Sequence, residues 1–330
     1  MPRFGTIISG TGSYVPEKRL TNQDLEKLVE TSNDWIVQRT GIRERRIASP
    51  DQASSDLAFE AARRALDTAK LSADDIDLII VATLTPDMLT PSTACVLQTR
   101  LGIKRHIGAF DMNAACSGFV YALATASQFI ANGAFKHILV VGAETLSRIV
   151  DYTDRGTCIL FGDGAGAVVL SASDDPERGL QAFELGADGA GGPLLNIPAG
   201  GSRLPILPEV LTRRDQYLKM NGREVYKFAV TQMTHSLQQA MQACSLTSEH
   251  VRLVVPHQVN QRIIDSATGK MGFPAEKVYI NIDRYGNTSG ASVPIALDEA
   301  MRGGRCGAGD WIIMVAFGAG LTWASATMRL

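Results

Sequence analysis

Short runs of apolar residues recur along the chain, and they are largely continuous rather than alternating with polar positions. A run of this kind is typical of a β-strand whose sheet is covered by helices on both faces. The sequence therefore predicts buried strands at residues 76–82, 137–142, 167–170, 251–255 and 311–317.

Longer segments between these runs carry helical patterns. Residues 55–70 are rich in Ala, Leu and Arg, residues 118–132 stop at an Asn-Gly pair, and residues 225–244 form a third such segment. The alternation of strands and helices predicts an α/β fold. The Gly- and Pro-rich segment 188–208 is predicted to be a long surface loop that joins two halves of the chain.

The two halves of the chain resemble each other. Residues 72–81 are similar to residues 247–256, and residues 109–142 are similar to residues 281–318. A repeat with so long a period indicates two copies of one domain rather than a solenoid. We therefore predict an N-terminal half at residues 1–175 and a C-terminal half at residues 176–330.

Length and charge exclude some classes of protein. The chain has 330 residues and a formal net charge of −2, so neither nucleic acid nor a membrane is expected as its main partner. No apolar run approaches the roughly 18 residues of a membrane span, and the first residues lack a secretory pattern. The five cysteines show no disulfide pattern. We expect a cytoplasmic protein.

Cys116, in the run Ala-Ala-Cys-Ser-Gly, lies between a strand and the predicted start of a helix. The free N–H groups and the positive dipole end of a helix stabilise a thiolate, so a lowered pKa and a nucleophilic role are expected. The alternative is a small buried side chain, which is common for free cysteine. That alternative is favoured for the other four, Cys95, Cys158, Cys244 and Cys306.

Two further side chains could act with this thiol. His257 directly follows a predicted strand, where ligands gather in α/β sheets. Asn287 lies in Tyr-Gly-Asn-Thr-Ser-Gly, where asparagine is also an ordinary turn residue. Taken singly, His257 could be an ordinary core or surface histidine, and Asn287 could be an ordinary turn residue. The repeat places Cys116 in one half and the other two residues in the second, which predicts a site at the junction of the halves.

Two glycine-rich runs lead to different predictions. Residues 161–166 precede a strand rather than a helix, which excludes the dinucleotide-binding geometry, and they are predicted to form a tight turn. Residues 317–323 follow a strand, and their backbone N–H groups could serve as oxyanion donors. The chain has no Walker lysine motif and no Cys/His cluster with metal-ligand spacing, so no metal site is expected.

These motifs resemble those of β-ketoacyl-acyl carrier protein synthase III, the initiating condensing enzyme of the thiolase superfamily. The resemblance covers nearly the whole chain, in the segments 31–43, 111–118, 153–156, 161–167, 256–260 and 286–290. It implies a thiolase-like, five-layered αβαβα fold of two pseudo-repeated halves, and a homodimer.

The resemblance also implies a mechanism. Cys116 would take the acyl group from a primer acyl-CoA, most simply acetyl-CoA, while the backbone N–H groups of Cys116 and Gly318 hold the oxyanion. His257 and Asn287 would stabilise the enolate formed when malonyl-acyl carrier protein loses CO₂. The carbanion would then attack the acyl-Cys116. No cofactor is implied, because acyl-CoA is a substrate.

Binding residues follow from the same resemblance. Trp35 and Arg155 would sandwich the CoA adenine, with Thr31 and Arg39 near the nucleotide and Asn260 near the pantetheine arm. Ordinary surface is the alternative interpretation of these residues. A basic surface that meets the acidic carrier protein would contain Lys227, Arg262 and Lys270, although a solvated charged face would look the same in sequence.

The chain departs from the family pattern at two places. Gly318-Ala-Gly replaces an all-glycine loop, and Leu89 and Thr90 stand where some members carry an aromatic residue with which the partner subunit closes the primer pocket. Smaller residues there would admit longer or branched primers.

Three alternatives to initiation remain open at this point. One is a specialised relative that loads a longer, branched or aromatic primer in secondary metabolism, and another is a non-catalytic subunit that binds acyl carriers. The presence of all three polar residues argues against the latter. The third, a degradative thiolase, would need a second Cys-Gly after the last strand, and Cys306-Gly lies before it.

Overall fold

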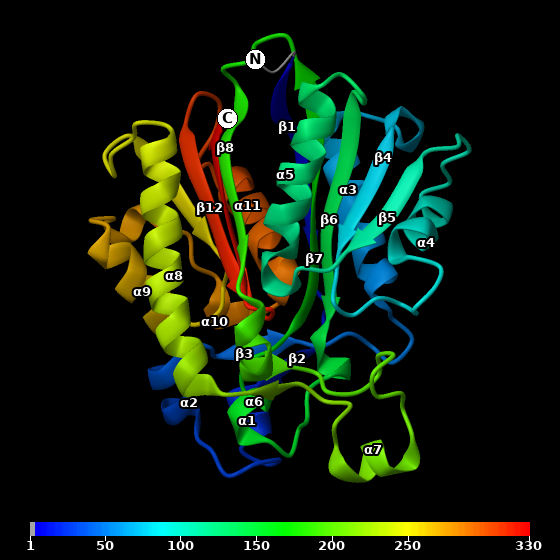
Figure 1. Cartoon of the computed structure of the whole chain (residues 1–330), viewed down its shortest axis with the longest axis vertical. Coiled ribbons are helices and arrows are strands. Elements are labelled where there is room, and N and C mark those ends of the chain that lie inside the picture. The colour runs from blue at the N-terminus through cyan, green and yellow to red at the C-terminus, as the bar shows by residue number, and fades with distance from the viewer. Residues whose placement is uncertain (1–3) are drawn as a thin grey trace.

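A computed structural model describes residues 4–330, and its main feature is one sheet in the order β11-β12-β13-β8-β1-β7-β6-β4-β5 (Figure 1). The first half of the chain contributes β1 (Gly5–Tyr14), β4 (Leu78–Ala82), β5 (Gly108–Met112), β6 (His137–Thr145) and β7 (Asp163–Ser173). The second half contributes β8 (Gly179–Ala187), β11 (Val251–Pro256), β12 (Trp311–Gly318) and β13 (Thr322–Arg329).

The two parts of this sheet repeat one topology. Strand β4 is parallel to β6, which is antiparallel to β7, which is antiparallel to β1. In the second part β11 is parallel to β12, which is antiparallel to β13, which is antiparallel to β8. The parts meet where β1 and β8 share a single parallel pair, Thr6 with Gly179. The predicted repeat is therefore present in the fold, and the predicted boundary at residue 175 falls between β7 and β8.

Helices lie on the outer faces of the two parts of the sheet and between them, which gives five layers (Figure 1). Helices α3 (Ser54–Ala69) and α4 (Thr93–Arg100) cover the outer face of the first half, and α8 (Gly222–Ala243) and α9 (Gln261–Lys270) cover that of the second. Helices α5 (Gly118–Ala131) and α11 (Ser292–Arg302) lie between the two parts of the sheet and contact both. The αβαβα arrangement is thus confirmed.

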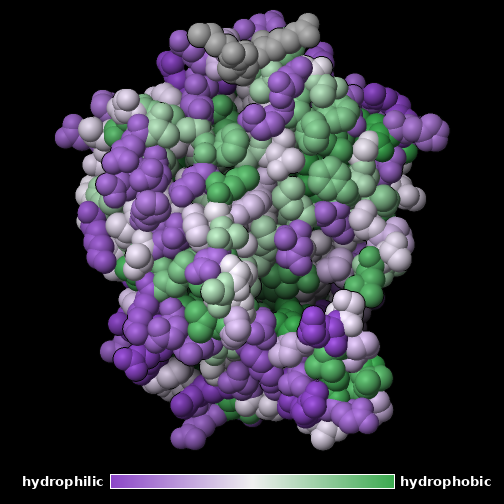
Figure 2. Space-filling model, viewed as in Figure 1, coloured by the Kyte–Doolittle hydropathy of each residue, from purple (hydrophilic) through white to green (hydrophobic). Residues whose placement is uncertain are grey.

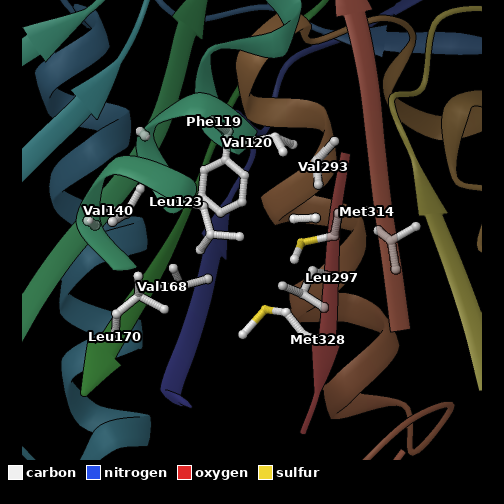
Figure 3. Close-up of a cluster of buried hydrophobic side chains, with 14 of the residues drawn as sticks. Phe119, Val120, Leu123, Val140, Val168, Leu170, Val293, Leu297, Met314 and Met328 are labelled. Atoms are coloured by element: carbon white, nitrogen blue, oxygen red, sulfur yellow. The ribbon is translucent and has the colours of Figure 1, made fainter. Parts of the chain in front are cut away.

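Three hydrophobic clusters correspond to these layers. Along β4, Leu78 and Ile80 belong to the central cluster with α5 and α11, whereas Ile79 and Val81 belong to the cluster under α3. Both faces of the strand are buried, which is why its sequence is continuously apolar. Figure 3 shows the central cluster, with side chains from both inner helices between the two parts of the sheet. The third cluster lies under α8 and α9.

The predicted elements agree with the structure in type, and their boundaries shift by a few residues. Helices α3, α5 and α8 occupy the predicted segments, and β7 is longer than predicted at both ends. The second half has no strand equivalent to β5, because helix α10 (Ile282–Tyr285) follows there and only an isolated bridge joins Val254 to Val278.

Two predictions about loops were wrong. Residues 161–166 form no tight turn, since Phe161 bridges to Asn287 and β7 begins at Asp163. Their glycines permit close packing instead: a Cβ on Gly162 would lie 2.3 Å from the Tyr285 carbonyl oxygen. Segment 188–208 follows β8, so it lies within the second half, and it contains the 3₁₀ helix η4 (Gly189–Leu194) and strand β9 (Leu195–Asn196).

The remaining short elements gather largely at the lower end of Figure 1, away from both termini. They are β2 (Arg19–Thr21), β3 (Glu44–Arg46), β10 (Lys219–Met220), α1 (Asn22–Leu25), α2 (Asn33–Thr40), α6 (Arg155–Cys158), α7 (Pro208–Arg213), and the 3₁₀ turns η1 (Ala73–Asp75), η2 (Ala115–Ser117), η3 (Leu146–Arg148), η5 (Ala275–Lys277) and η6 (Ser289–Ala291). Within residues 4–330 no helix has the length and apolar character needed to cross a bilayer.

Candidate active site

Residues from both halves of the chain line one predominantly apolar pocket. Cys116 comes from the first half, and His257, Asn287 and Gly318 come from the second, as the repeat predicted. The pocket is narrow, with a cavity volume of about 40 Å³. Its other lining residues are Leu160, Phe161, Leu195, Met220, Val225, Phe228, Val259, Phe317 and Leu321. Polar groups in such surroundings interact more strongly than they would in water.

Cys116 lies in η2, between the end of β5 and the start of α5. Its side chain is buried, with 8% of the residue exposed. The pKa of the Cys116 thiol is raised to about 12, mainly by burial and in part by the nearby Glu144 carboxyl. The lowered pKa expected from the helix N-terminus was therefore wrong for the free protein, because desolvation outweighs the dipole.

His257 directly follows β11 and is fully buried. Its backbone N–H donates to the Val315 carbonyl at 2.7 Å, and its Nδ1 lies 2.6 Å from Ser292 Oγ. Ser292 Oγ already accepts the N–H of Gln258 at 3.4 Å. Its own proton is thus available to Nδ1, an arrangement that leaves the N–H of a neutral imidazole on Nε2. Burial lowers the pKa of His257 to about 3, and Nε2 has no hydrogen-bond partner among residues 4–330.

Asn287 is held at both backbone groups. Its N–H donates to the Leu160 carbonyl at 2.8 Å, and its carbonyl accepts the Gly162 N–H at 3.0 Å. The side-chain oxygen accepts the Ser289 N–H at 2.8 Å. Because the oxygen is occupied in this way, the Nδ2 group is the end of the amide that remains available to a substrate.

Gly318 ends β12 directly against the cysteine. A Cβ at Gly318 would lie 2.7 Å from Cys116 N and 3.0 Å from Cys116 Cβ, so only glycine fits there. Ala319, which departs from the all-glycine pattern, is partly exposed and its carbonyl accepts the Thr322 hydroxyl at 3.0 Å. The alanine therefore does not stand at the position where the backbone approaches the thiol.

Sequence reasoning missed three polar residues of this site. Ser292 holds the imidazole, the Ser289 hydroxyl is buried without a hydrogen-bond partner, and Glu144 is a fully buried carboxyl whose Oε1 lies 3.4 Å from the Gly290 N–H. Glu144 directly follows the apolar residues of β6, and an ionisable residue at the end of a buried strand could have drawn attention.

Trp35 and Arg39 on α2 lie close to Arg155 on α6. The Arg155 guanidinium lies 5.1 Å from the centre of the Trp35 ring, and that of Arg39 lies 4.6 Å from it. Arg155 also donates to the Glu30 carbonyl at 3.0 Å. A flat ring between Trp35 and Arg155 would need about 7 Å, two van der Waals separations. The two residues are close neighbours, but the space between them is closed.

Thr31 and Asn260 differ in what they can offer a ligand. The Thr31 hydroxyl is buried and has no hydrogen-bond partner among residues 4–330. Asn260 caps α9: its oxygen accepts the Arg262 N–H at 2.9 Å, and its Nδ2 donates to the Arg39 carbonyl at 3.0 Å. Both ends of the Asn260 amide are thus engaged within the protein.

Lys227, Arg262 and Lys270 are all exposed, on the packed pair α8 and α9. Lys227 pairs with Glu224 at 2.9 Å, and the Arg262 guanidinium lies 5.9 Å from the Tyr226 ring centre. Helix α8 borders the pocket through Val225 and Phe228. Within residues 4–330 the structure contains no group of three or more His, Cys, Asp or Glu side chains that could hold a metal ion.

Comparisons with known proteins give one family. The models for 3-oxoacyl-[acyl-carrier-protein (ACP)] synthase III and for its C-terminal domain match residues 110–189 and 241–330. The β-ketoacyl-[acyl-carrier-protein] synthase III of Caldanaerobacter subterraneus is 54% identical over 98% of this chain and 97% of that protein. The crystal structure of 3-oxoacyl-[acyl-carrier-protein] synthase III from Aquifex aeolicus superposes with a TM-score of 0.91, at 47% identity over 99% of this chain and 100% of that one. A priming β-ketosynthase of the R1128 polyketide pathway is 35% identical, with a TM-score of 0.91, over 100% of this chain and 97% of that one.

Proposed function

The chain belongs to the 3-oxoacyl-[acyl-carrier-protein] synthase III family, and we propose that it initiates fatty acid biosynthesis as an acyltransferase with Cys116, His257 and Asn287 as its catalytic residues. One observation carries this assignment of roles: the three side chains converge from two halves of the chain in one apolar pocket. The free ends of the imidazole and the amide are both suited to donate hydrogen bonds.

In the first half-reaction, Cys116 attacks the thioester carbonyl of a primer acyl-CoA. The negative charge on the carbonyl oxygen is held by the backbone N–H groups of Cys116 and Gly318, and CoA leaves as the acyl-enzyme forms. The close approach of Gly318 to Cys116 supports this pairing of donors. Acetyl-CoA is the proposed primer.

In the second half-reaction, malonyl-acyl carrier protein enters the same pocket. His257 Nε2 and Asn287 Nδ2 donate to its thioester carbonyl and stabilise the enolate as CO₂ leaves. The carbanion attacks the acyl-Cys116 and yields the 3-ketoacyl product. Decarboxylation generates the carbanion without a base, so two neutral donors suffice, and the low pKa of His257 keeps the imidazole neutral. These steps need no cofactor.

The CoA nucleotide is proposed to bind at Trp35, Arg39 and Arg155, with Thr31 close by. Because the space between Trp35 and Arg155 is closed, the Arg155 side chain must leave the ring to admit the adenine. Asn260 contributes by fixing the start of α9 beside Arg39, and a contact with the pantetheine arm requires it to release one of its present bonds.

The acidic carrier protein is proposed to approach α8 and α9 through Lys227, Arg262 and Lys270. Figure 2 shows mainly hydrophilic residues on the left side of this face, over α8 and α9. Helix α8 also supplies Val225 and Phe228 to the pocket, and the pocket residue Val259 lies just before α9. A carrier bound there would lie beside the pocket into which its pantetheine arm extends.

A homodimer is proposed to form along β5. In the part of the chain that the structure describes, this strand lies at the edge of the sheet with β4 as its only neighbour, and Phe110 on it is 36% exposed. Unpaired edge strands favour pairing with another chain. Leu89 is 91% exposed and is not among the pocket-lining residues of its own chain, so Leu89 and Thr90 are available to a partner's pocket. A cytoplasmic location is proposed with this function.

The specialised alternative, a longer, branched or aromatic primer, has weaker support, because the relatives that share about half their residues with this chain are described as synthase III. Intact-mass measurement after incubation with acetyl-, isobutyryl-, octanoyl- and aryl-CoA tests the proposal. We expect an acetyl increment on the wild-type chain and none on Cys116→Ala. An increment from octanoyl- or aryl-CoA alone would favour the alternative, and full condensation activity in Cys116→Ala would overturn the mechanism.

A further inference from the structure

A buried carboxyl group lies beside the nucleophile and has no role in the steps above. Glu144, near the end of β6, is fully buried. It accepts hydrogen bonds from Thr85 Oγ1 at 2.7 Å, Thr83 Oγ1 at 3.3 Å and the Leu84 N–H at 3.2 Å. No lysine, arginine or histidine among residues 4–330 forms an ion pair with it. A buried carboxylate without a nearby cation is unfavourable, and taking up a proton removes the unfavourable charge.

Glu144 also reaches the turn that faces Cys116. Its Oε1 lies 3.4 Å from the Gly290 N–H. A Cβ built on Gly290 would lie 3.4 Å from Glu144 Oε1 and 3.4 Å from the carbonyl oxygen of Ala115, the residue before Cys116. The carboxyl group and the nucleophile turn are therefore separated by little more than the Gly290 backbone.

Ser289 lies in η6, which contacts both η2, the turn that holds Cys116, and β6, the strand that holds Glu144. Ser289 lowers the pKa of both groups, and its buried hydroxyl has no hydrogen-bond partner among residues 4–330. A buried hydroxyl without a partner is uncommon.

The reaction needs a proton acceptor at this point. A thiol must lose its proton to become a nucleophile, and the thiol of Cys116 is buried. His257 is not suited to accept it, because Nδ1 is engaged by Ser292 and Nε2 carries the N–H that the second half-reaction requires.

We propose that Glu144 is the proton acceptor for the Cys116 thiol, acting through the Ser289 hydroxyl, an inference that rests on the proposed function of Cys116. The Cys116 S–H proton passes to Ser289 Oγ while the Ser289 hydroxyl proton passes to a Glu144 carboxylate oxygen. The sulfur electron pair forms the new C–S bond, and the bond between the acyl carbon and the CoA sulfur breaks. Glu144 returns its proton through Ser289 to the departing thiolate, and CoA leaves as a neutral thiol.

The surroundings of Glu144 suit this exchange. Burial raises the pKa of Glu144 to about 7, opposed by the bonds from Thr85, Leu84, Ser289 and Gly290. The Glu144 carboxyl in turn raises the pKa of Cys116, so the two groups interact. A group with a pKa near neutrality can both take and return a proton.

The rate of acetyl transfer to Cys116, measured by rapid quench and intact mass from about pH 6 to 9, tests the proposal. Wild-type acylation should rise through about pH 7, where Glu144 becomes a carboxylate. Glu144→Gln should lose this inflection, and its rate at high pH should fall about a hundredfold. Ser289→Ala should behave likewise, and Ala115 shows that alanine accepts the same backbone conformation, with φ of 47° against 48°.

Asp298→Asn is the matched control, because Asp298 is another buried carboxyl and bonds Thr11, Ser13 and Arg302 instead of the pocket. It should keep the wild-type pH profile. An unchanged profile and rate in folded Glu144→Gln and Ser289→Ala would overturn the relay while leaving the nucleophile assignment intact. If wild-type Cys116 took up no acetyl group at any pH, the proposed function itself would fail.

Discussion

Asn113 and Asn287 make the same hydrogen bond in the two halves of the chain. The side-chain oxygen of Asn113 accepts the Ala115 N–H at 3.1 Å, and that of Asn287 accepts the Ser289 N–H at 2.8 Å. Each of these bonds precedes a 3₁₀ turn and then a helix of the central layer, α5 or α11. Asn113 is exposed and Asn287 is buried in the pocket, so duplication has produced one turn with two environments.

Because Asn113 and Asn287 make the same bond in their turns, the same substitution at both positions separates the role of the Asn287 Nδ2 donor from that of the turn. Asn287→Asp keeps the oxygen that accepts the Ser289 N–H but replaces the Nδ2 donor. We expect CO₂ release from malonyl-acyl carrier protein to fall about 10²–10³-fold, the usual effect of losing one donor to an oxyanion, while acylation of Cys116 persists. Asn113→Asp makes the same change in the exposed turn and should leave both steps intact. Equal losses in the two variants would show that the turn, rather than the donor, matters.

The repeat predicted that the three polar residues converge, and the family resemblance implied the layered fold, with which the repeat agrees. The sequence could not predict the raised pKa of Cys116. The start of helix α5, and with it the helix dipole, can be recognised in the sequence, whereas the burial of the thiol depends on packing between the two halves. Glu144 was missed for a related reason. Its contacts to Leu84 and Gly290 join segments far apart in the chain, and a lone glutamate after a strand does not reveal them.

The approach of Gly318 to Cys116 predicts a strict size limit. In Gly318→Ala the new Cβ would lie 2.7 Å from Cys116 N, so either the nucleophile or the end of β12 must move. Acyl transfer should fall about 10²–10³-fold, as expected when one oxyanion donor is displaced. Gly307→Ala is the control, because no atom lies within 4 Å of its Cβ position. Single-turnover acylation checks both variants, and wild-type rates in Gly318→Ala would refute the proposed donor pair.

Because Trp35 lies with Arg39 and Arg155 at the proposed nucleotide site, its loss should weaken the binding of acyl-CoA without slowing the chemical step. Trp35→Ala removes the ring that stacks on the nucleotide, a contact worth about 1–1.5 kcal/mol. The KM for acyl-CoA should rise about tenfold with kcat little changed. A short acyl thioester of N-acetylcysteamine, which lacks the nucleotide, should react equally with both proteins. If Trp35→Ala slowed that substrate as well, the tryptophan would be acting on the structure of the site.

The exposed bases on α8 and α9 predict a dependence on salt. Arg262→Glu combined with Lys270→Glu should lower kcat/KM for malonyl-acyl carrier protein about tenfold at low salt, and the loss should shrink as ionic strength rises. Lys104→Glu, an exposed lysine just after α4 on the opposite outer layer, is the control. Malonyl-CoA should be used equally by all three proteins. A loss that persisted at high salt would argue against a charged docking surface.

The buried imidazole of His257 links catalysis to stability. Its pKa is about 3 in the folded protein and about 6.5 when the chain is unfolded. Below about pH 6.5 the unfolded chain binds the proton more readily, so this residue destabilises the fold by about 1.4 kcal/mol per pH unit as the pH falls toward 3. His257→Gln removes the titration. The free energy of unfolding in urea should therefore show the variant gaining about 2 kcal/mol on the wild type between pH 7 and pH 5. A constant difference would mean that the pKa of His257 is the same in the folded and the unfolded chain. The ring would then be protonated at pH 5 and would lose the acceptor nitrogen that Ser292 now engages.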